Sequence, residues 1–339
     1  MRLQVNALRK YDVVTESSFM PLVEEIKKFF KGSKILIVTD SNVEKLYLNE
    51  VKNLLKEYQV FSYTIDAGES SKNVDNYLRI LNYLADNSFY RKDMVIALGG
   101  GVVGDLAGFV ASTYMRGIVL VQCPTTLLAS VDSSVGGKTG VDLPQGKNLV
   151  GTIYQPYLTY INLATFSSLP EREIKCGLGE IVKYAYISTS ISEDLLSKGI
   201  TQELIIQCIK IKAQIVSEDE FDNGKRAILN LGHTIGHAIE SLANYTLSHG
   251  SCVCLGIKKV IEMSRKFYNL PKEKVASFNN ILSFAGEGEN FLFNMEKVIE
   301  KISMDKKAEN KGVNFILIKD FGDVRIENLS LDKIKELLL

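Results

Sequence analysis

Short apolar runs alternate with amphipathic stretches over the first third of the chain. The runs at 34–40 (KILIVTD), 60–65, 93–98 (DMVIAL) and 118–123 (IVLVQC) are typical of strands, and apolar spacing at 43–57, 74–85 and 102–112 predicts helices. Strands that alternate with helices indicate βαβ units, whose strands form a mainly parallel sheet.

The pattern changes around residues 157–175. Pro170, followed by Glu171 and Glu173, is typical of a helix start, and helical spacing then dominates to about Ser303. Strands are expected again at 313–318 and 324–326, with a closing helix at 331–339. The 339 residues fit two domains. We therefore predict an α/β protein, with an N-terminal Rossmann-like parallel-sheet domain at 1–158 and a mostly α-helical domain at 159–339.

Charge and cysteine content narrow the classes of function. Forty Lys plus Arg balance forty Asp plus Glu, which argues against a nucleic-acid-binding protein. The start of the chain has no continuous apolar stretch of the kind found in signal peptides, and no run of about 18 apolar residues predicts a membrane span. Five cysteines, an odd number without a disulfide-like spacing, indicate a reducing compartment. We expect a cytoplasmic protein.

A glycine-rich turn follows the third predicted strand. Residues 99–104 (GGGVVG) match G-x-G-x-x-G before a helix, an arrangement that brings backbone N–H groups close to a pyrophosphate. Alone the match is weak, and a glycine-rich turn without a nucleotide is the alternative. The acid expected about 20 residues on is absent, because the next strand ends in Gln122-Cys123-Pro124. A bound ribose would need another partner, such as Asp40 or Asp105.

All three histidines of the chain, His233, His237 and His249, fall within 17 residues. Histidine is the commonest metal ligand and the usual acid–base group near neutral pH. If 226–237 is one helix, Arg226, Asn230, His233 and His237 lie within about 60° of one another on one face. The spacing leaves open whether His233 pairs with His237 or with His249 as a metal ligand.

A carboxylate would complete a three-ligand metal site with an open position. Glu180 is the best candidate, because it follows two glycines and has Lys183 one helical turn on. The alternative is an ordinary Glu/Lys pair on a solvated helix face.

The run 124–151 is rich in glycine and small hydroxyl residues and carries Lys138, Lys147 and Asn148. Lysine charges beside exposed backbone donors suit a phosphate group. Arg116 could add a further cation, and a plain surface loop with ordinary lysines is the alternative.

Eight segments of the chain together resemble the 3-dehydroquinate synthase family, in family order. They are 68–72, 99–112, 124–142 (PTTLLASVDSSVGGKTGVD), 146–151, 177–185 (GLGEIVKYA), 229–240 (LNLGHTIGHAIE), 249–250 and 305–307. They span nearly the whole chain. The resemblance implies the dehydroquinate-synthase fold, bound NAD, a divalent metal (zinc, or cobalt) and a homodimer.

Residue roles follow from the same resemblance. It implies that Glu180, His233 and His249 bind the metal, and that His237 is an acid–base or substrate-binding group. Implied NAD contacts are Asp40, Asn42, Glu69, Lys72, Gly100, Gly101, Val102, Asp105, Thr125, Thr126, Asp132, Lys147, Thr165 and Ser168. Implied substrate contacts are Arg116, which in this family is expected to reach across a dimer interface, Lys138, Asn148, Lys183, Lys212, Arg226, Asn230 and one of Lys306 and Lys307. Lys307 is taken as the candidate of that pair, and the choice between the two stays open.

The implied reaction converts 3-deoxy-D-arabino-heptulosonate 7-phosphate to 3-dehydroquinate and phosphate. It proceeds by transient oxidation with NAD, phosphate elimination, re-reduction and an intramolecular aldol step. One residue departs from the family pattern: Asp222 stands where a glutamate is usual, four positions before Arg226. Its shorter side chain keeps the charge but changes its reach, so its role is open.

Three other functions compete with this interpretation. Another sugar phosphate cyclase, acting on sedoheptulose 7-phosphate or glucose 6-phosphate, would use a substrate without the carboxylate that Arg226 suits. A metal-dependent polyol or alcohol dehydrogenase of related fold would accumulate NADH. A regulatory protein that binds NAD and metal without turnover is the third, and the full set of candidate groups argues against it.

Overall fold

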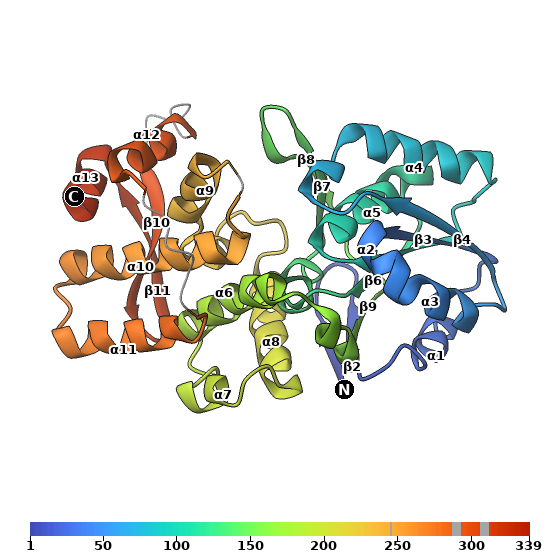
Figure 1. The fold of residues 1–339 in the computed structure, drawn as a ribbon, viewed down its shortest axis with the longest axis horizontal. Helices are drawn as coiled ribbons and strands as arrows, with labels where there is room; N and C mark the ends of the chain where they lie inside the picture. The colour runs from blue at the N-terminus through green and yellow to red at the C-terminus, as the bar shows by residue number, and fades with distance from the viewer. Residues whose placement is uncertain (245, 287–292, 306–311) are drawn as a thin grey trace. The chain divides into compact units, whose positions relative to one another are not determined.

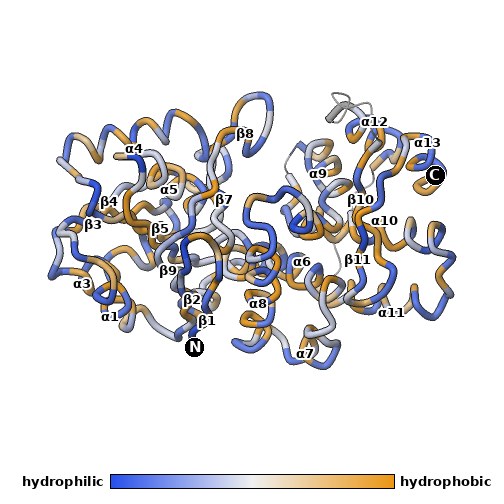
Figure 2. The backbone as a smooth tube through the Cα atoms, turned by 180° about the vertical axis from the view of Figure 1, so that it is seen from behind, coloured by the Kyte–Doolittle hydropathy of each residue, from blue (hydrophilic) through white to orange (hydrophobic). Residues whose placement is uncertain are grey.

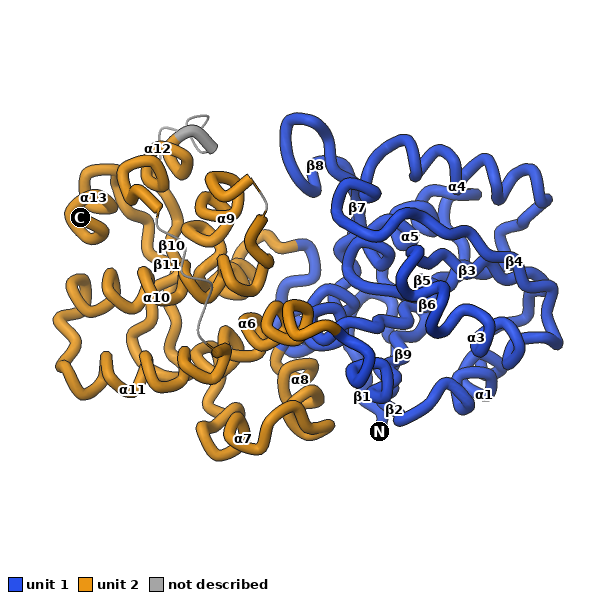
Figure 3. The backbone as a smooth tube through the Cα atoms, viewed as in Figure 1, with its two compact units in different colours: residues 1–169, 212–221 blue, residues 170–211, 222–339 orange. Residues whose placement is uncertain are grey.

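The computed structural model describes residues 1–244, 246–286, 293–305 and 312–339, which form two compact units (Figure 3). Unit 1 is Met1–Leu169 with Lys212–Phe221, and unit 2 is Pro170–Ile211 with Asp222–Leu339. The first unit extends past the predicted boundary at 158, because strand β9 (Leu158–Asn162) pairs with β2 and β6 in its sheet. None of the described helices is long and apolar enough to cross a membrane.

A seven-stranded sheet forms the centre of unit 1 (Figure 1). The order of its strands is β1-β2-β9-β6-β5-β3-β4. Its other strands are β1 (Arg2–Val5), β2 (Tyr11–Glu16), β3 (Lys34–Asp40), β4 (Gln59–Ile65), β5 (Met94–Gly99) and β6 (Val119–Pro124). All neighbouring strands pair in parallel except β1 and β2. The four predicted strands and the parallel sheet are confirmed. Strands β1, β2 and β9 extend the sheet beyond the prediction.

Both faces of this sheet are covered by helices. Successive strand residues point to opposite faces, so Ile35 and Ile37 pack in one apolar cluster while Leu36 and Val38 pack in another. The first cluster takes side chains from α1 (Leu22–Lys27) and α3 (Asn49–Leu54), and the second from α4 (Val74–Asp86) and α5 (Gly101–Thr113). Helix α4 alternates apolar and polar segments in Figure 2, as expected of a helix with one buried face. Short helical segments complete this part: α2 (Ser41–Val43), η1 (Glu44–Leu48), η2 (Glu69–Ser71) and η3 (Tyr114–Arg116).

The order of the strands creates a switch point between β3 and β5. From β3 the chain continues to its neighbour β4, whereas from β5 it continues to β6 on the other side. In open parallel sheets, ligands bind outside the carboxyl ends of strands at such a point. Asp40 ends β3 and the glycine-rich turn follows β5, so both predicted cofactor elements lie at this edge.

Much of the run 124–151 folds into a separate hairpin. After η4 (Ala129–Ser133), strand β7 (Lys138–Leu143) pairs antiparallel with β8 (Gly146–Ile153), and β7 packs against α5. Segment η5 (Leu163–Ser168) then ends the first part of unit 1.

Unit 2 is mostly helical, as predicted, and its described residues include a two-stranded sheet. Its elements are α6 (Glu171–Ile187), α7 (Glu193–Ser197), α8 (Gln202–Glu218, whose end belongs to unit 1), η6 (Lys225–Asn230), α9 (His233–Leu242), α10 (His249–Tyr268), α11 (Lys272–Ser283), α12 (Met295–Asp305), β10 (Val313–Asp320), β11 (Asp323–Leu329) and α13 (Leu331–Leu338). Helix α10 packs against α6, α9, α11, α13 and β10, so it forms the centre of the unit.

The expectation of a single helix over 226–237 is wrong. The short 3-10 segment η6 ends at Asn230, and Gly232 takes a left-handed conformation with φ of 78° before α9 begins at His233. A Cβ on Gly232 would lie 2.6 Å from Ile257 Cγ1 on α10, so glycine is required for both shape and space. His233 and His237 therefore share α9, while Arg226 and Asn230 belong to a different segment.

Candidate metal centre and cofactor site

Glycines let three helices of unit 2 approach closely enough for their polar side chains to meet. A Cβ on Gly179 of α6 would lie 2.5 Å from Gly250 O of α10, and one on Gly256 would lie 2.0 Å from Gly232 O. Any larger residue at Gly179 or Gly256 would push the backbones apart. Glu180 on α6, His233 at the start of α9 and His249 at the start of α10 lie beside these contacts.

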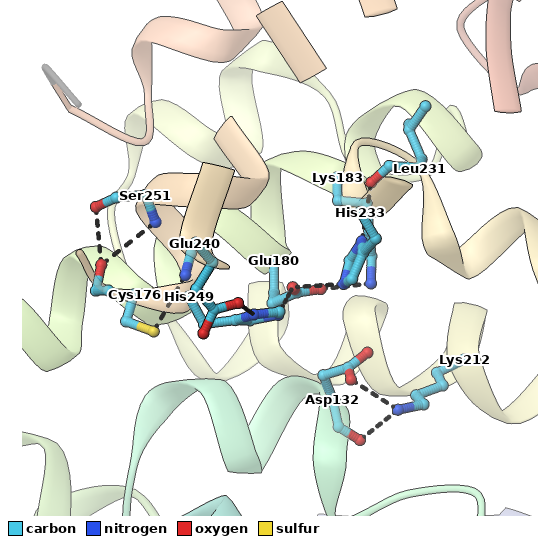
Figure 4. Close-up of polar contacts among 12 residues, drawn as sticks. Asp132, Cys176, Glu180, Lys183, Lys212, Leu231, His233, Glu240, His249 and Ser251 are labelled. Carbon is cyan, nitrogen blue, oxygen red and sulfur yellow. Dashed lines mark hydrogen bonds and ion pairs between the residues drawn. The ribbon is translucent and has the colours of Figure 1, made fainter. Parts of the chain in front are cut away.

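Glu180, His233 and His249 converge on one point (Figure 4). Glu180 Oε1 lies 3.4 Å from His233 Nε2 and 3.3 Å from His249 Nε2. The Glu180 side chain is buried, and its second oxygen pairs with Lys183 Nζ. The centroid of the His237 ring lies 5.3 Å from that of His233 and 5.7 Å from that of His249, and the His237 side chain is exposed.

The other ring nitrogen of each inner histidine faces an acceptor. His233 Nδ1 lies 3.1 Å from Leu231 O, and His249 Nδ1 lies 3.5 Å from Glu240 Oε2. An acceptor at Nδ1 favours the tautomer with its proton there, which leaves the Nε2 lone pair directed at Glu180 and the centre. Glu240 was not among the residues predicted from sequence, although it lies inside the 229–240 segment.

The electrostatics of the cluster favour bound positive charge. Burial alone would raise the pKa of Glu180, but Lys183 and His233 hold that pKa well below its usual range. Burial lowers the pKa of His249, yet Glu180 and Glu240 together raise it to about 9. The negative charge of the two carboxylates stabilises a proton on the imidazole. The same negative charge can stabilise a bound metal cation in place of that proton.

These residues fit a divalent metal. Two ligand atoms that each lie about 2.05 Å from a tetrahedral ion are separated by about 3.3 Å. The contacts of Glu180 Oε1 with the two Nε2 atoms match that separation. The three histidines also form a looser group, with ligand atoms within 4.8 Å of one another. The neighbouring Cys176 fits poorly as a ligand, because burial raises the pKa of its thiol to about 11.

In unit 1, several of the predicted NAD residues lie at or directly after the carboxyl ends of strands β3, β5 and β6. Asp40 Oδ1 accepts the N–H groups of Asn42 and Val43 and so caps α2. Gly100 precedes α5, whose first backbone N–H groups are free of helical partners by their position. Thr125 Oγ1 is buried without a hydrogen-bond partner among the described residues. An unsatisfied hydroxyl beside a glycine-rich helix start fits a bound dinucleotide.

A charged cluster lies beside this edge. The ammonium of Lys72, which is buried, lies 2.8 Å from Glu69 Oε1, 3.4 Å from Asp105 Oδ2 and 3.7 Å from Asp142 Oδ1. Lys147 Nζ lies 3.7 Å from Glu69 Oε1. Burial raises the pKa of Asp105 to about 6 even though Lys72 opposes the shift. Burial lowers the pKa of Lys72, but Asp105 and Glu69 together raise it above its ordinary value.

Other predicted contacts are engaged within unit 1. Tyr47 Oη lies 2.6 Å from Ser168 Oγ and also contacts Thr165 O, so η5 packs against η1, the segment that follows α2 in the chain. Lys212 Nζ donates to the backbone oxygen of Asp132 at 2.7 Å and pairs with its carboxylate at 2.9 Å (Figure 4). The predicted NAD residue Asp132 and the predicted substrate residue Lys212 are thus direct partners.

The predicted substrate residues differ in exposure. In unit 1, Arg116, Lys138 and Asn148 are exposed, whereas in unit 2 Arg226 is buried and Asn230 is exposed. Lys306 and Lys307 lie outside the described residues.

Family models and curated relatives agree on one family over most of the chain. Family models described as 3-dehydroquinate synthase N-terminal and C-terminal match residues 62–176 and 177–308. The chain is 38% identical over 336 residues to 3-dehydroquinate synthase of Clostridium acetobutylicum, covering 94% of this chain and 93% of the relative. It is 41% identical over 335 residues to that of Latilactobacillus sakei, covering 95% and 93%.

A solved structure extends the comparison to cofactors. The structure of 2-deoxy-scyllo-inosose synthase complexed with carbaglucose-6-phosphate, NAD+ and Co2+ superposes with a TM-score of 0.91 at 25% identity, covering 100% of this chain and 99% of that one.

Proposed function

The chain belongs to the 3-dehydroquinate synthase family, and on that premise we propose how its residues divide the family's reaction. The reaction converts 3-deoxy-D-arabino-heptulosonate 7-phosphate to 3-dehydroquinate and phosphate. The enzyme that catalyses it is a carbon–oxygen lyase of the shikimate pathway, which leads to the aromatic amino acids. The observation that carries the residue assignment is the convergence of Glu180 Oε1 on the Nε2 atoms of His233 and His249.

NAD and a divalent ion, zinc or cobalt, are the proposed cofactors. When bound, NAD takes up and returns a hydride, and the ion polarises adjacent hydroxyls of the sugar acid. The cyclase structure that contains NAD+ and Co2+ supports both. The residues that would hold NAD are Asp40, Asn42, Glu69, Lys72, Gly100, Gly101, Val102, Asp105, Thr125, Thr126, Asp132, Lys147, Thr165 and Ser168.

Glu180, His233 and His249 are the proposed metal ligands. The separations of Glu180 Oε1 from the two Nε2 atoms and the acceptor behind each imidazole support this set. His237, exposed beside the centre, is then available to move a proton between substrate and solvent. Lys183, buried against Glu180, keeps that carboxylate ionised at neutral pH.

The substrate has two anionic groups, a phosphate and a carboxylate, and we assign different residues to each. We assign Lys138, Asn148 and Arg116 to the phosphate, because they are exposed and because cationic donors form strong charge-assisted hydrogen bonds with phosphate oxygens. Arg226, Asn230, Lys212 and Lys183 are assigned to the carboxylate and hydroxyls, together with Lys307. The planar guanidinium of Arg226 suits a carboxylate, which the substrates of the other cyclases lack.

A homodimer in the cytoplasm completes the proposal. Met115, Arg116 and Gly117 take positive φ values of 51°, 62° and 112°, and Met115 is 46% exposed. A strained turn that presents an apolar and a cationic side chain suits delivery of Arg116 to a second subunit. The five cysteines are all free, as suits a reducing compartment.

The test of this function is product formation from three phosphorylated sugars. With metal and NAD present, we expect 3-dehydroquinate from the heptulosonate phosphate and no cyclised product from sedoheptulose 7-phosphate or glucose 6-phosphate. Turnover of either sugar phosphate without a carboxylate, in preference to the heptulosonate phosphate, would overturn the assignment and favour another cyclase of this fold.

A further inference from the structure

Asp142 lies at an irregularity in the β7–β8 hairpin. The register shifts between Val141 and Leu143, so the strand pairing matches no β8 residue to Asp142. Its N–H instead donates to Lys72 O at 2.8 Å, and it forms a parallel bridge with Asn73. Bulges of this kind redirect a side chain and recur near functional sites. Here the bulge joins the hairpin to the segment that carries Lys72.

The Asp142 carboxylate forms a hydrogen bond with β8, the second strand of the same hairpin. Its Oδ1 accepts the backbone N–H of Asn148 at 2.7 Å. Asn148 has a left-handed φ of 56°, a conformation that few non-glycine residues adopt without a local reason. The carboxylate therefore fixes the backbone from which the Asn148 side chain projects.

The same carboxylate also faces the charged cluster. Asp142 Oδ1 lies 3.7 Å from Lys72 Nζ, and Lys72 in turn contacts Glu69 and Asp105. Lys147, the residue before Asn148, lies 3.7 Å from Glu69. Asp142 thus contacts Lys72, which is assigned to NAD, and Asn148, which is assigned to phosphate.

We infer that Asp142 is a positioning residue that couples NAD binding to recognition of the substrate's phosphate group. The inference rests on the proposed function, which assigns Glu69, Lys72 and Lys147 to NAD and Asn148 to phosphate. NAD that contacts Lys72 and Lys147 stabilises one arrangement of the hairpin tip, and through Asp142 the same arrangement presents Asn148. A ligand that orders a shared element lowers the cost of binding a second ligand there, and the effect is reciprocal.

The experiment titrates inorganic phosphate into NAD-free and NAD-saturated protein by calorimetry. For the unaltered chain, NAD is expected to tighten phosphate binding at least about fivefold. In Asp142→Ala this ratio is expected to fall to about one. The ratio is the readout because removing a carboxylate near two lysines can itself strengthen anion binding. Asp142→Asn keeps an acceptor for the Asn148 N–H, so part of the ratio should return.

Thr139→Val is the matched control. The Thr139 hydroxyl donates to Thr152 O at 2.9 Å across the same hairpin, so its loss loosens the hairpin without touching the cluster. This variant is expected to keep the coupling ratio. A ratio of one in the unaltered chain, an unchanged ratio in Asp142→Ala, or equal loss in Thr139→Val would each overturn the inference.

A wrong assignment of the phosphate site would give a different experimental result from a wrong role for Asp142. If Lys138→Ala and Asn148→Ala leave phosphate affinity unchanged, the phosphate site in the proposed function is wrong. If those variants weaken phosphate binding while Asp142→Ala keeps the ratio, only the coupling role fails.

Discussion

Replacing His249 with alanine is expected to remove the metal and to lower kcat/KM by at least about 10³-fold, since partners behind metal ligands alone are worth 10–100-fold. Replacing His237 is expected to leave the metal bound and to lower kcat by about 10²–10⁴-fold, the usual loss when an acid–base group is removed. The physical reason is that His249 Nε2 faces Glu180 Oε1, whereas His237 is exposed beside the centre. Metal content after dialysis and steady-state phosphate release measure the two effects.

The pair of variants decides between the two ligand sets that residue spacing leaves open. Metal loss in His237→Ala, with full metal in His249→Ala, would contradict the proposed ligands. Glu180→Ala is a less useful probe, because it leaves Lys183 buried without its carboxylate. Breaking a buried ion pair in this way costs about 3–5 kcal/mol, so loss of folding would confuse the result.

The role of Glu240 can be graded in the same assay. Glu240→Ala is expected to weaken cobalt affinity by about 10–100-fold, and Glu240→Gln by less, because the amide oxygen still accepts from His249 Nδ1. Glu262→Ala, which removes a half-exposed carboxylate paired with Lys259 on the same helix α10, should leave the affinity unchanged. Equal affinity in all three variants would show that Glu240 does not orient the ligand.

Removal of the Lys138 ammonium is expected to lower kcat/KM by about 10²-fold. A hydrogen bond to a charged group contributes about 1.5–3 kcal/mol, and the phosphate is both the anchor and the leaving group. Lys138 is exposed at the start of β7, so Lys138→Ala should fold normally. Initial rates of phosphate release over a range of substrate concentrations separate the effect on KM from that on kcat.

Two further variants control for the loss of charge at this position. Lys138→Arg keeps the cation and should recover part of the rate, and Lys198→Ala removes an exposed lysine paired with Asp194 and should have no effect. Wild-type kinetics in Lys138→Ala would show that Lys138 does not bind the phosphate group.

The sequence predicts the parts of the fold that depend on local pattern. Continuous apolar runs such as 34–40 become strands buried on both faces, because every position faces a helix layer. Strands β1, β2 and β9 escape prediction because their pairing is not local. Asp12 of β2, for example, pairs with Leu158 of β9, and neither segment is uniformly apolar.

For the site, too, the sequence predicts what depends on local pattern and misses what depends on contacts between distant segments. The three histidines are predicted as a metal centre from their clustering, and Glu180 from its flanking glycines. The prediction that Arg226 and His233 share one helical face is wrong because Gly232 interrupts the helix. Nothing in the residue spacing indicates that Gly232 adopts a left-handed conformation. Asp142 and Glu240 are missed because their roles arise from contacts across the hairpin and between helices.

In the proposed reaction one protein oxidises the substrate, eliminates its phosphate and reduces the resulting ketone again, without net redox chemistry. The most direct measurement follows phosphate and NADH together during turnover of 3-deoxy-D-arabino-heptulosonate 7-phosphate, with and without a chelator. We predict stoichiometric phosphate and 3-dehydroquinate, no accumulating NADH, and arrest of both products by the chelator. NADH that accumulates in proportion to substrate consumed, or no phosphate release with metal and NAD present, would contradict the proposed function.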